Sequence, residues 1–364
     1  MALRVIVSLI LMLLLLGAVI YWITFHPDPV QEQPVVCRSE APLLRPGRSL
    51  KVMTYNVQYM AGKKYVFFYE LPGDRGPDDR PAPEVIAYTV GEVARIIREE
   101  RPDVVLLQEV NDGAKRTDYR DQLALLLEEL PEEYACHTSA FYWKAAFVPH
   151  PRILGSVGMK LSIVSRYRID RAVRYQLPPA PNNILKRQFY FKRAVLEARL
   201  PLEGGGELAV LNTHLDAWSG GSDVKQRQVD FILGLVSRLD SAGVPWVLGG
   251  DFNLLPPGLT PEQLPDYLEP YYEKEGTLRE LYARYPAVPP LAAVTGPEYR
   301  RWFTHFPNHP HISAPDRTID YIFASRWIGN VQGYVRQHDT QEISDHLPVI
   351  MECRVPGLIG ADRH

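Results

Sequence analysis

Cysteine is scarce in this chain, and basic residues are not in excess. The 364 residues include 3 Cys, and 40 Lys and Arg stand against 43 Asp and Glu, which gives a formal net charge of -3. A near-neutral total gives no sign of a general nucleic-acid-binding protein. Internal repeats and a glycine-rich phosphate loop are also missing, so neither a repeat architecture nor a P-loop nucleotide site is expected. The 46% hydrophobic residues are enough for one large core or two small ones.

The three cysteines are Cys37, Cys136 and Cys353. Their spacing matches no zinc pattern, and an odd number is a poor disulfide framework. Because Cys37 falls in a predicted linker, a bridge between Cys136 and Cys353 is one alternative, although nothing in the sequence supports it. We favour the interpretation that the cysteines are small buried hydrophobic residues.

The amino-terminal segment is a candidate membrane helix. Residues 5–25 carry no charge and reach the length of about 20 residues that crosses a bilayer. A cleaved signal peptide is the alternative, but its apolar run would be shorter, whereas this one continues through Tyr21 and Trp22, which suit a membrane interface. We therefore predict an uncleaved transmembrane anchor over residues 1–26. Arg4 precedes the span and residues 26–36 contain no Lys or Arg, which predicts a catalytic domain on the non-cytoplasmic side.

The rest of the chain divides into a linker, one large domain and a tail. Residues 27–49 are proline-rich and are expected to be a tether, residues 50–356 the catalytic domain, and residues 357–364 a tail. Runs typical of strands occupy residues 50–57, 103–108, 157–165, 194–200, 207–213, 245–249, 318–324 and 348–353, and helical spacing marks residues 90–97 and 224–239. Several strands follow one another without a helix, which predicts a layered α/β sandwich. Two long insertions, residues 61–83 and 256–315, interrupt it, and the second is expected to carry short helices over the site.

Polar side chains stand where the predicted strands end or begin. They are Asn56, Glu109, His214, Asp251, Asn253, Asp345 and His346. One such residue would be a solvated group or a turn former, but this many in one chain are hard to assign to turns. Loops at strand ends present side chains to ligands, so these positions predict a site.

Six segments around these positions resemble, in order, the motifs of the endonuclease/exonuclease/phosphatase superfamily. They are Thr54-Tyr55-Asn56-Val57, Leu107-Gln108-Glu109-Val110, Asn212-Thr213-His214-Leu215, Gly249-Gly250-Asp251-Phe252-Asn253, Thr318-Ile319-Asp320-Tyr321-Ile322 and Ser344-Asp345-His346-Leu347-Pro348. The superfamily includes deoxyribonuclease I, apurinic endonucleases, neutral sphingomyelinases and inositol polyphosphate 5-phosphatases. The resemblance implies a four-layer α/β sandwich, with two stacked sheets flanked by helices and the site at one edge.

The resemblance also implies a metal site. Glu109 matches the principal metal ligand of the superfamily, with Asn56 beside it, and Asp345 matches a carboxylate that binds a metal or orients its waters. Magnesium is the expected cation, because it prefers a few carboxylates plus waters, and manganese can use the same oxygen ligands.

The remaining matched residues receive catalytic roles from the resemblance. Asp251 is expected to position or deprotonate the attacking water, and Asn253 to hold a phosphate oxygen. His346 is expected to pair with Asp320, while His214 donates to a phosphate oxygen. For Arg193, a phosphate contact and a surface salt bridge are equally good interpretations. His305, His309 and His311 suggest zinc by composition, but Pro307 and Pro310 prevent helical presentation, so a substrate-side loop is favoured.

The motifs leave the substrate open among three classes. We favour a phosphodiesterase acting on a phospholipid headgroup, because of the anchor, the low net charge and the aromatic segments at residues 65–69, 141–143 and 189–191. Each aromatic segment taken alone suits an ordinary core. A nuclease is the alternative, with a phosphate-tracking surface of Arg152, Lys186, Arg187, Lys192 and Arg193. A non-catalytic binding module is less favoured, because no matched position is substituted. No protein partner is predicted.

Overall fold

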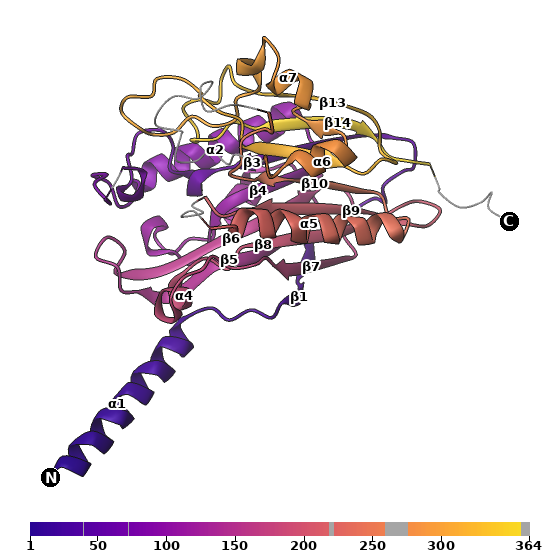
Figure 1. Ribbon diagram of the computed structural model, residues 1–364. Coiled ribbons are helices and arrows are strands. Elements are labelled where there is room, and N and C mark those ends of the chain that lie inside the picture. The colour runs from indigo at the N-terminus through magenta and orange to yellow at the C-terminus, as the bar shows by residue number, and fades with distance from the viewer. Residues whose placement is uncertain (39, 72, 218–221, 259–275, 358–364) are drawn as a thin grey trace.

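The domain is a four-layer α/β sandwich, as the sequence predicts (Figure 1). The computed structural model describes residues 1–364 except 39, 72, 218–221, 259–275 and 358–364. Within the described residues, one seven-stranded sheet has the order β1 (Val30–Gln33), β7 (Arg171–Gln176), β8 (Ala194–Pro201), β9 (Glu207–His214), β10 (Trp246–Asp251), β12 (Asp320–Ala324) and β11 (Ala287–Val288). The other has the order β13 (Gly329–Val335), β14 (Val349–Arg354), β3 (Ser49–Asn56), β4 (Val104–Asn111), β6 (Gly155–Ser165), β5 (Cys136–Val148) and β2 (Val35–Cys37).

Helices cover the outer faces of both sheets. The helices α2 (Pro83–Glu100) and α3 (Gln122–Glu129) pack on the sheet that contains β3, and α5 (Val224–Ser241) and α6 (Arg279–Arg284) pack on the sheet that contains β10. The connections carry α4 (Ile184–Phe189), α7 (Leu291–Val294) and the 3₁₀ turns η1 (Gln58–Met60), η2 (Phe68–Glu70), η3 (Lys115–Thr117) and η6 (Tyr299–Trp302).

The central strands are buried on both faces, which explains their continuous apolar sequence. In β4, Val104 and Leu106 lie between the two sheets, whereas Val105 and Leu107 pack against α2 and α3. Burying each such side chain contributes roughly 1.5–3 kcal/mol. The apolar runs therefore build the double sheet and leave the strand ends to carry polar residues.

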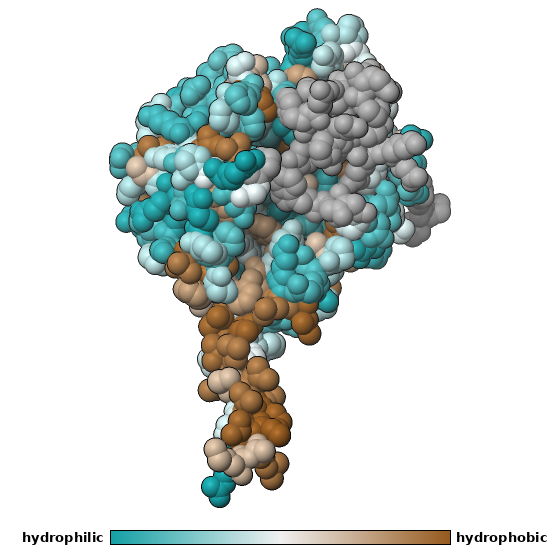
Figure 2. Space-filling view, turned by 60° about the vertical axis from the view of Figure 1, so that its left-hand side comes forward, coloured by the Kyte–Doolittle hydropathy of each residue, from teal (hydrophilic) through white to brown (hydrophobic). Residues whose placement is uncertain are grey.

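The helix α1 (Ala2–Ile23) projects away from the sandwich (Figures 1 and 2). It contains no buried residue, and it is long and apolar enough to cross a membrane. A signal sequence would have the same length and composition. Among the described residues, it is the one helix with this property.

Residues 30–37 are not a free tether, which corrects the expectation for the proline-rich segment. The strand β1 pairs with β7 at the edge of one sheet, and β2 pairs with β5 at the edge of the other. Short edge strands of this kind have no clear apolar alternation, and proline is tolerated beside them. Of the predicted tail at residues 357–364, residues 358–364 lie outside the described residues, as do residues 259–275 of the second insertion.

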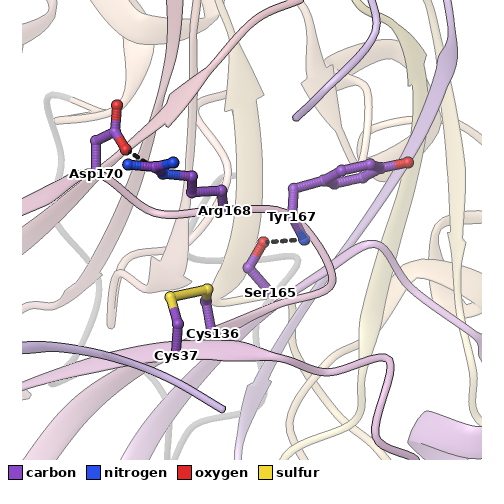
Figure 3. Close-up of a disulfide and its surroundings, with 6 residues drawn as sticks. All are labelled: Cys37, Cys136, Ser165, Tyr167, Arg168 and Asp170. Atoms are coloured by element: carbon purple, nitrogen blue, oxygen red, sulfur yellow. Dashed lines mark hydrogen bonds and ion pairs between the residues drawn. A yellow bond between two sulfur atoms is a disulfide. The ribbon is translucent and has the colours of Figure 1, made fainter. Parts of the chain in front are cut away.

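A disulfide joins Cys37 to Cys136, so our interpretation of the cysteines was wrong for this pair (Figure 3). The two residues are direct partners in the β2–β5 pairing, and their Cα atoms are 4.1 Å apart. The alternative bridge from Cys136 to Cys353 is also wrong, because Cys353 is a buried free thiol on β14, far along the same sheet. The error followed from treating Cys37 as part of a disordered linker.

Candidate active site

Strand ends bring the predicted site residues to one edge of the sandwich. Asn56 ends β3, which is parallel to β4, and His214 and Asp251 end the parallel strands β9 and β10. Parallel strands place their carboxyl ends at the same edge of a sheet. The strand β12 runs antiparallel to β10, so its first residue, Asp320, lies opposite Asp251.

A bulge in β4 turns Glu109 toward this edge. The pairing with β6 shifts register between Leu107 and Val110, and Glu109 has a φ of +58°. Gln108 keeps its place between the sheets, where its Nε2 donates to Asn212 Oδ1 over 2.7 Å. Without the extra residue, the strand alternation would point Glu109 toward the helices, so the bulge redirects its side chain.

Gly250 allows β10 to lie tightly beside β9 just before Asp251. Its φ is +152°, and a Cβ atom there would lie 2.0 Å from the carbonyl oxygen of Thr213. A residue with a side chain therefore cannot take this position without moving the strand. The glycine fixes where the Asp251 carboxylate emerges.

Asp251 is the centre of a buried hydrogen-bond network. Its Oδ2 accepts from Asn56 Nδ2 over 3.1 Å and lies 3.2 Å from His214 Nε2, while its Oδ1 accepts from the backbone N–H of Asn253 over 2.9 Å. Burial and the negative charge of Asp320 raise the pKa of Asp251 to about 7. Burial and the charge of Arg193 lower the pKa of His214 well below its usual value, so His214 is neutral.

His346 is held by Asp320 and is positively charged. Its Nδ1 lies 2.8 Å from Asp320 Oδ2, and its Nε2 lies 3.6 Å from Asp251 Oδ2. Burial alone would lower the pKa of His346, but the carboxylates of Asp320, Asp251 and Asp345 outweigh it and raise the pKa to about 10. A charged imidazole has an N–H on both ring nitrogens and is a donor to anions, not a metal ligand.

Glu109 and Asp345 form the carboxylate pair that suits a divalent cation. Glu109 Oε1 accepts from Asn56 Nδ2 over 3.3 Å, and Ser344 Oγ donates to Asp345 Oδ1 over 3.3 Å. Burial and the neighbouring Asp345 charge raise the pKa of Glu109. A bound cation would offset this repulsion between the two carboxylates. Two tighter groups of possible ligand atoms, one with His305 and Asp345 and one with Asp251 and Asp320, both require His346. Since His346 Nδ1 is already paired with Asp320, and a hard cation prefers oxygen ligands, the Glu109 and Asp345 oxygens fit such a cation better.

Arg193 is buried, so the surface salt bridge considered for it is wrong. Its side chain is 6% exposed, lies over the Phe191 ring at 4.3 Å and over the Tyr142 ring at 5.1 Å, and its Nε is 3.6 Å from Asp216 Oδ1. Its Nε and Nη1 have no hydrogen-bond partner among the described residues. Unpaired guanidinium donors at a cavity are suited to an anion.

Glu109, His214, Asp251, Asp345 and His346 line a cavity of about 730 Å³. Asn56 and Asp320 do not line it but form hydrogen bonds with Asp251 and His346. We call Asn56, Glu109, His214, Asp251, Asp320, Asp345 and His346 the catalytic floor. We call Trp143, Ile153, Leu154, Tyr190 and Phe191, which line the cavity from β5, the β5–β6 turn and the segment after α4, the aromatic wall. Asn253 also lines the cavity, and its Nδ2 donates to the carbonyl oxygen of Leu215 over 3.2 Å.

Sequence reasoning missed several cavity residues, above all Glu70 and Arg116. Glu70 comes from the first insertion, where Gln58 Nε2 donates to its Oε1 over 3.1 Å, and burial together with Asp345 raises its pKa to about 9. Arg116 lies 3.5 Å from the Tyr59 ring. Neither residue directly follows a strand, so neither shows the pattern that predicted the catalytic floor, a polar residue at the end of an apolar run.

Of the three candidate histidines, His309 and His311 lie together, with ring centroids 5.4 Å apart, whereas His305 packs against His346. The ring of His305 is 4.7 Å from that of His346, and burial with the Arg317 charge lowers the pKa of His305 to about 3. His309 lines the cavity, whereas His311 is exposed. This arrangement agrees with a loop beside the substrate.

The predicted cationic and aromatic surfaces divide between the cavity and its outside. Arg152 and Arg193 line the cavity, while Lys186 and Arg187 are exposed on α4. Of the aromatic segments, Phe67 and Tyr142 are core residues, and Tyr69, Trp143, Tyr190 and Phe191 line the cavity.

Comparison with known proteins supports the fold and identifies the family. Residues 53–346 match the model of the Endonuclease/Exonuclease/phosphatase family. No curated protein sequence matches the chain.

Solved structures share the architecture. An endonuclease/exonuclease/phosphatase from Beutenbergia cavernae is 26% identical, with a TM-score of 0.52 over 85% of this chain and 72% of that chain. TDP2 from Caenorhabditis elegans is 16% identical, with a TM-score of 0.50 over 85% of this chain and 75% of that chain. A protein of the same family from Leptotrichia buccalis is 16% identical, with a TM-score of 0.50 over 84% of this chain and 99% of that chain. The last two similarities concern the fold alone.

Proposed function

Because the chain belongs to the Endonuclease/Exonuclease/phosphatase family, whose members are generally metal-dependent phosphoester hydrolases, we propose that it is a membrane-anchored phosphodiesterase acting on phospholipid headgroups. The observation that carries the proposal is one cavity that joins the catalytic floor to the aromatic wall. The floor supplies the chemistry of phosphoester hydrolysis. The wall, next to the end of α1, suits a substrate with an apolar part.

Glu109 and Asp345 are the residues that would hold the divalent cation, with Asn56 keeping Glu109 in position through its 3.3 Å hydrogen bond. Magnesium, or manganese on the same oxygens, supplies charge neutralisation at the phosphoryl oxygens when bound. Asn56 is a positioning residue in this scheme, because its Nδ2 also donates to Asp251.

Hydrolysis requires a base for water and cations for the phosphoryl charge. Asp251 accepts the proton of the attacking water as the water oxygen bonds to phosphorus and the bond to the leaving oxygen breaks. Its pKa of about 7 suits a base that must bind and release a proton near neutral pH. The charged His346, oriented by Asp320, donates to a phosphoryl oxygen.

Asn253 and Arg193 complete the phosphate site, while neutral His214 positions Asp251, because both of its ring nitrogens already have partners. His214 is fixed between Asp251 and the Tyr142 hydroxyl, which is 3.3 Å from its Nδ1. Arg193 offers its Nη1, which has no hydrogen-bond partner among the described residues, to the anion, while its Nε faces Asp216. Stacking on Phe191 holds its guanidinium in the plane needed for that contact.

The Cys37–Cys136 disulfide supports a non-cytoplasmic catalytic domain, because disulfides persist in oxidising compartments. It agrees with the charge asymmetry around residues 5–25. Determining the amino-terminal residue of the mature protein would separate an anchor from a cleaved signal.

A nuclease is the second candidate, favoured by Arg152, which lines the cavity, and by the exposed cations Lys186 and Arg187 on α4. The test uses the purified full chain with magnesium on mixed micelles of sphingomyelin, phosphatidylcholine, phosphatidylglycerol and phosphatidylinositol, with released headgroup as the readout. Glu109→Gln is the matched inactive control. Headgroup release that is lost in the control supports the proposal. Plasmid nicking together with no release from any lipid would replace it with the nuclease.

A further inference from the structure

The end of α1 is fixed to the sandwich at β5, which also forms the aromatic wall. Thr24 forms a backbone bridge with Ala145, and the rings of Phe25 and Phe141 are 6.5 Å apart. Only residues 24–29 separate α1 from β1. With so short a connection, already attached to β5, the domain cannot move far from the end of α1.

The helix α4 lies beside this attachment and exposes aliphatic side chains (Figure 1). Ile184 is 82% exposed and Leu185 is 56% exposed, and Phe147 on β5 is 42% exposed. The helix is fastened to β5, because Trp143 Nε1 donates to the carbonyl oxygen of Phe189 over 2.8 Å. Hydrophobic residues continue from α1 onto this end of the domain (Figure 2).

The two chain segments that form this patch carry charge of one sign. Residues 141–154 and 177–193 contain no Asp or Glu, and Lys144, Lys186 and Arg187 are exposed. Aliphatic and basic side chains together suit the interface of a bilayer with anionic lipids. Nucleic acid would use the cations but gains nothing from an exposed isoleucine and leucine.

We propose that Lys144, Phe147, Ile184, Leu185, Lys186 and Arg187 form a membrane-contact surface that rests on an anionic phospholipid bilayer, the same one that α1 crosses. The surface rests on the anchor in the proposed function and deepens it. Tyr190 and Phe191 follow α4 directly and line the cavity. Contact of α4 with the leaflet brings the aromatic wall to the level of the lipid headgroups, so a substrate enters without leaving the bilayer surface.

The test reads contact with lipid and needs no turnover. The full-length Ile184→Cys variant carries an environment-sensitive fluorophore and is placed in nanodiscs of phosphatidylcholine and phosphatidylglycerol with a headgroup-proximal doxyl quencher. The matched control is Tyr88→Cys on α2, where the side chain is 66% exposed on a different layer. We expect at least twofold quenching at residue 184 and none at residue 88, and a loss of that quenching when Lys186 and Arg187 are changed to Glu.

Equal quenching at the two positions, or none at residue 184, would refute the proposed membrane-contact surface. An emission change at residue 184 caused by duplex DNA and not by lipid would also overturn it, in favour of a nucleic-acid contact. Since the readout is independent of catalysis, a surface that contacts lipid in a chain that releases no headgroup would refute the phospholipid activity alone.

Discussion

The catalytic floor and the aromatic wall face the same cavity but are built in opposite ways. On the floor, Asn56, Asp251 and Asp320 are each 1% exposed and are held by strand ends and mutual hydrogen bonds. On the wall, Leu154 is 52% exposed and comes from a turn between strands. The floor therefore has a rigid geometry suited to a defined reaction, whereas the wall can vary in sequence without disturbing the sheets. This difference separates the residues that set the reaction from those that select the substrate.

The division between the catalytic floor and the aromatic wall is tested most directly by substituting one residue of each. Asp251→Asn should lower kcat by about 10³–10⁴-fold with little change in KM, because it removes the base while preserving the side-chain shape. Tyr190→Ala should raise KM by about tenfold and change kcat much less, because it removes an aromatic contact worth about 1.4 kcal/mol. Steady-state kinetics of the full chain in detergent, on the lipid it hydrolyses and on bis-nitrophenyl phosphate, would measure both.

Similar changes in kcat for the two variants would contradict the division between floor and wall. Thermal unfolding of Asp251→Asn supplies the control for folding. Its unfolding should remain cooperative, with a lower Tm, because the amide places an N–H where Asp251 accepts hydrogen bonds.

The pH dependence of kcat/KM tests the roles proposed for Asp251 and His346. The quantity kcat/KM should rise with pH as Asp251 loses its proton, above the usual range of a carboxyl because burial and Asp320 raise its pKa. It should fall again as the pH approaches about 10, where His346 loses its proton. Asp320→Asn should lower kcat by about 10²-fold and move the alkaline fall to lower pH by about 1 unit, since it removes the charge that stabilises the imidazolium.

A pH–rate profile of the parent and of Asp320→Asn would decide this point. A reduced kcat with an unmoved alkaline limb would mean that Asp320 serves the fold and not the charge state of His346.

The smallest effect on activity is expected far from both surfaces of the cavity, at the disulfide. Replacing Cys37 and Cys136 together by Ser should lower the free energy of unfolding by about 2–4 kcal/mol. It should leave kcat within about twofold of the parent, because β2 contributes no residue to the cavity. A reducing agent should lower the Tm of the parent and not that of the double variant. A large loss of kcat in this variant would show that the edge strands support the site.

The sequence predicted those strands that are buried on both faces of a sheet. The apolar runs of β4, β9 and β10 were found, but β5, β7 and β13 were missed. In β5, buried and exposed residues alternate along much of a 13-residue strand that includes polar and aromatic positions, so its hydrophobic signal is weaker. The very short strands β1 and β2 depend on neighbours that are distant in sequence, and no local pattern marks them.

Site residues were predicted where a polar side chain directly follows or precedes a strand, and they were missed where the side chain comes from a connecting segment. Asn56, Glu109, Asp251 and His346 stood next to apolar runs in ordered motifs. Glu70 and Arg116 reach the cavity from connecting segments, whose path depends on packing against several elements at once.

The sequence by itself determined that buried strands build a layered α/β domain, that a charge-free apolar segment precedes it, and that acids, amides and histidines stand at the strand ends. Apolar periodicity and polar strand ends are local properties, so they are visible in one dimension. Only the tertiary structure decided that Glu109 turns through a bulge, that Cys37 meets Cys136, that Arg193 is buried, and that α4 lies beside the end of α1. Each of these outcomes depends on contacts between residues far apart in the chain, whose energies no local window contains.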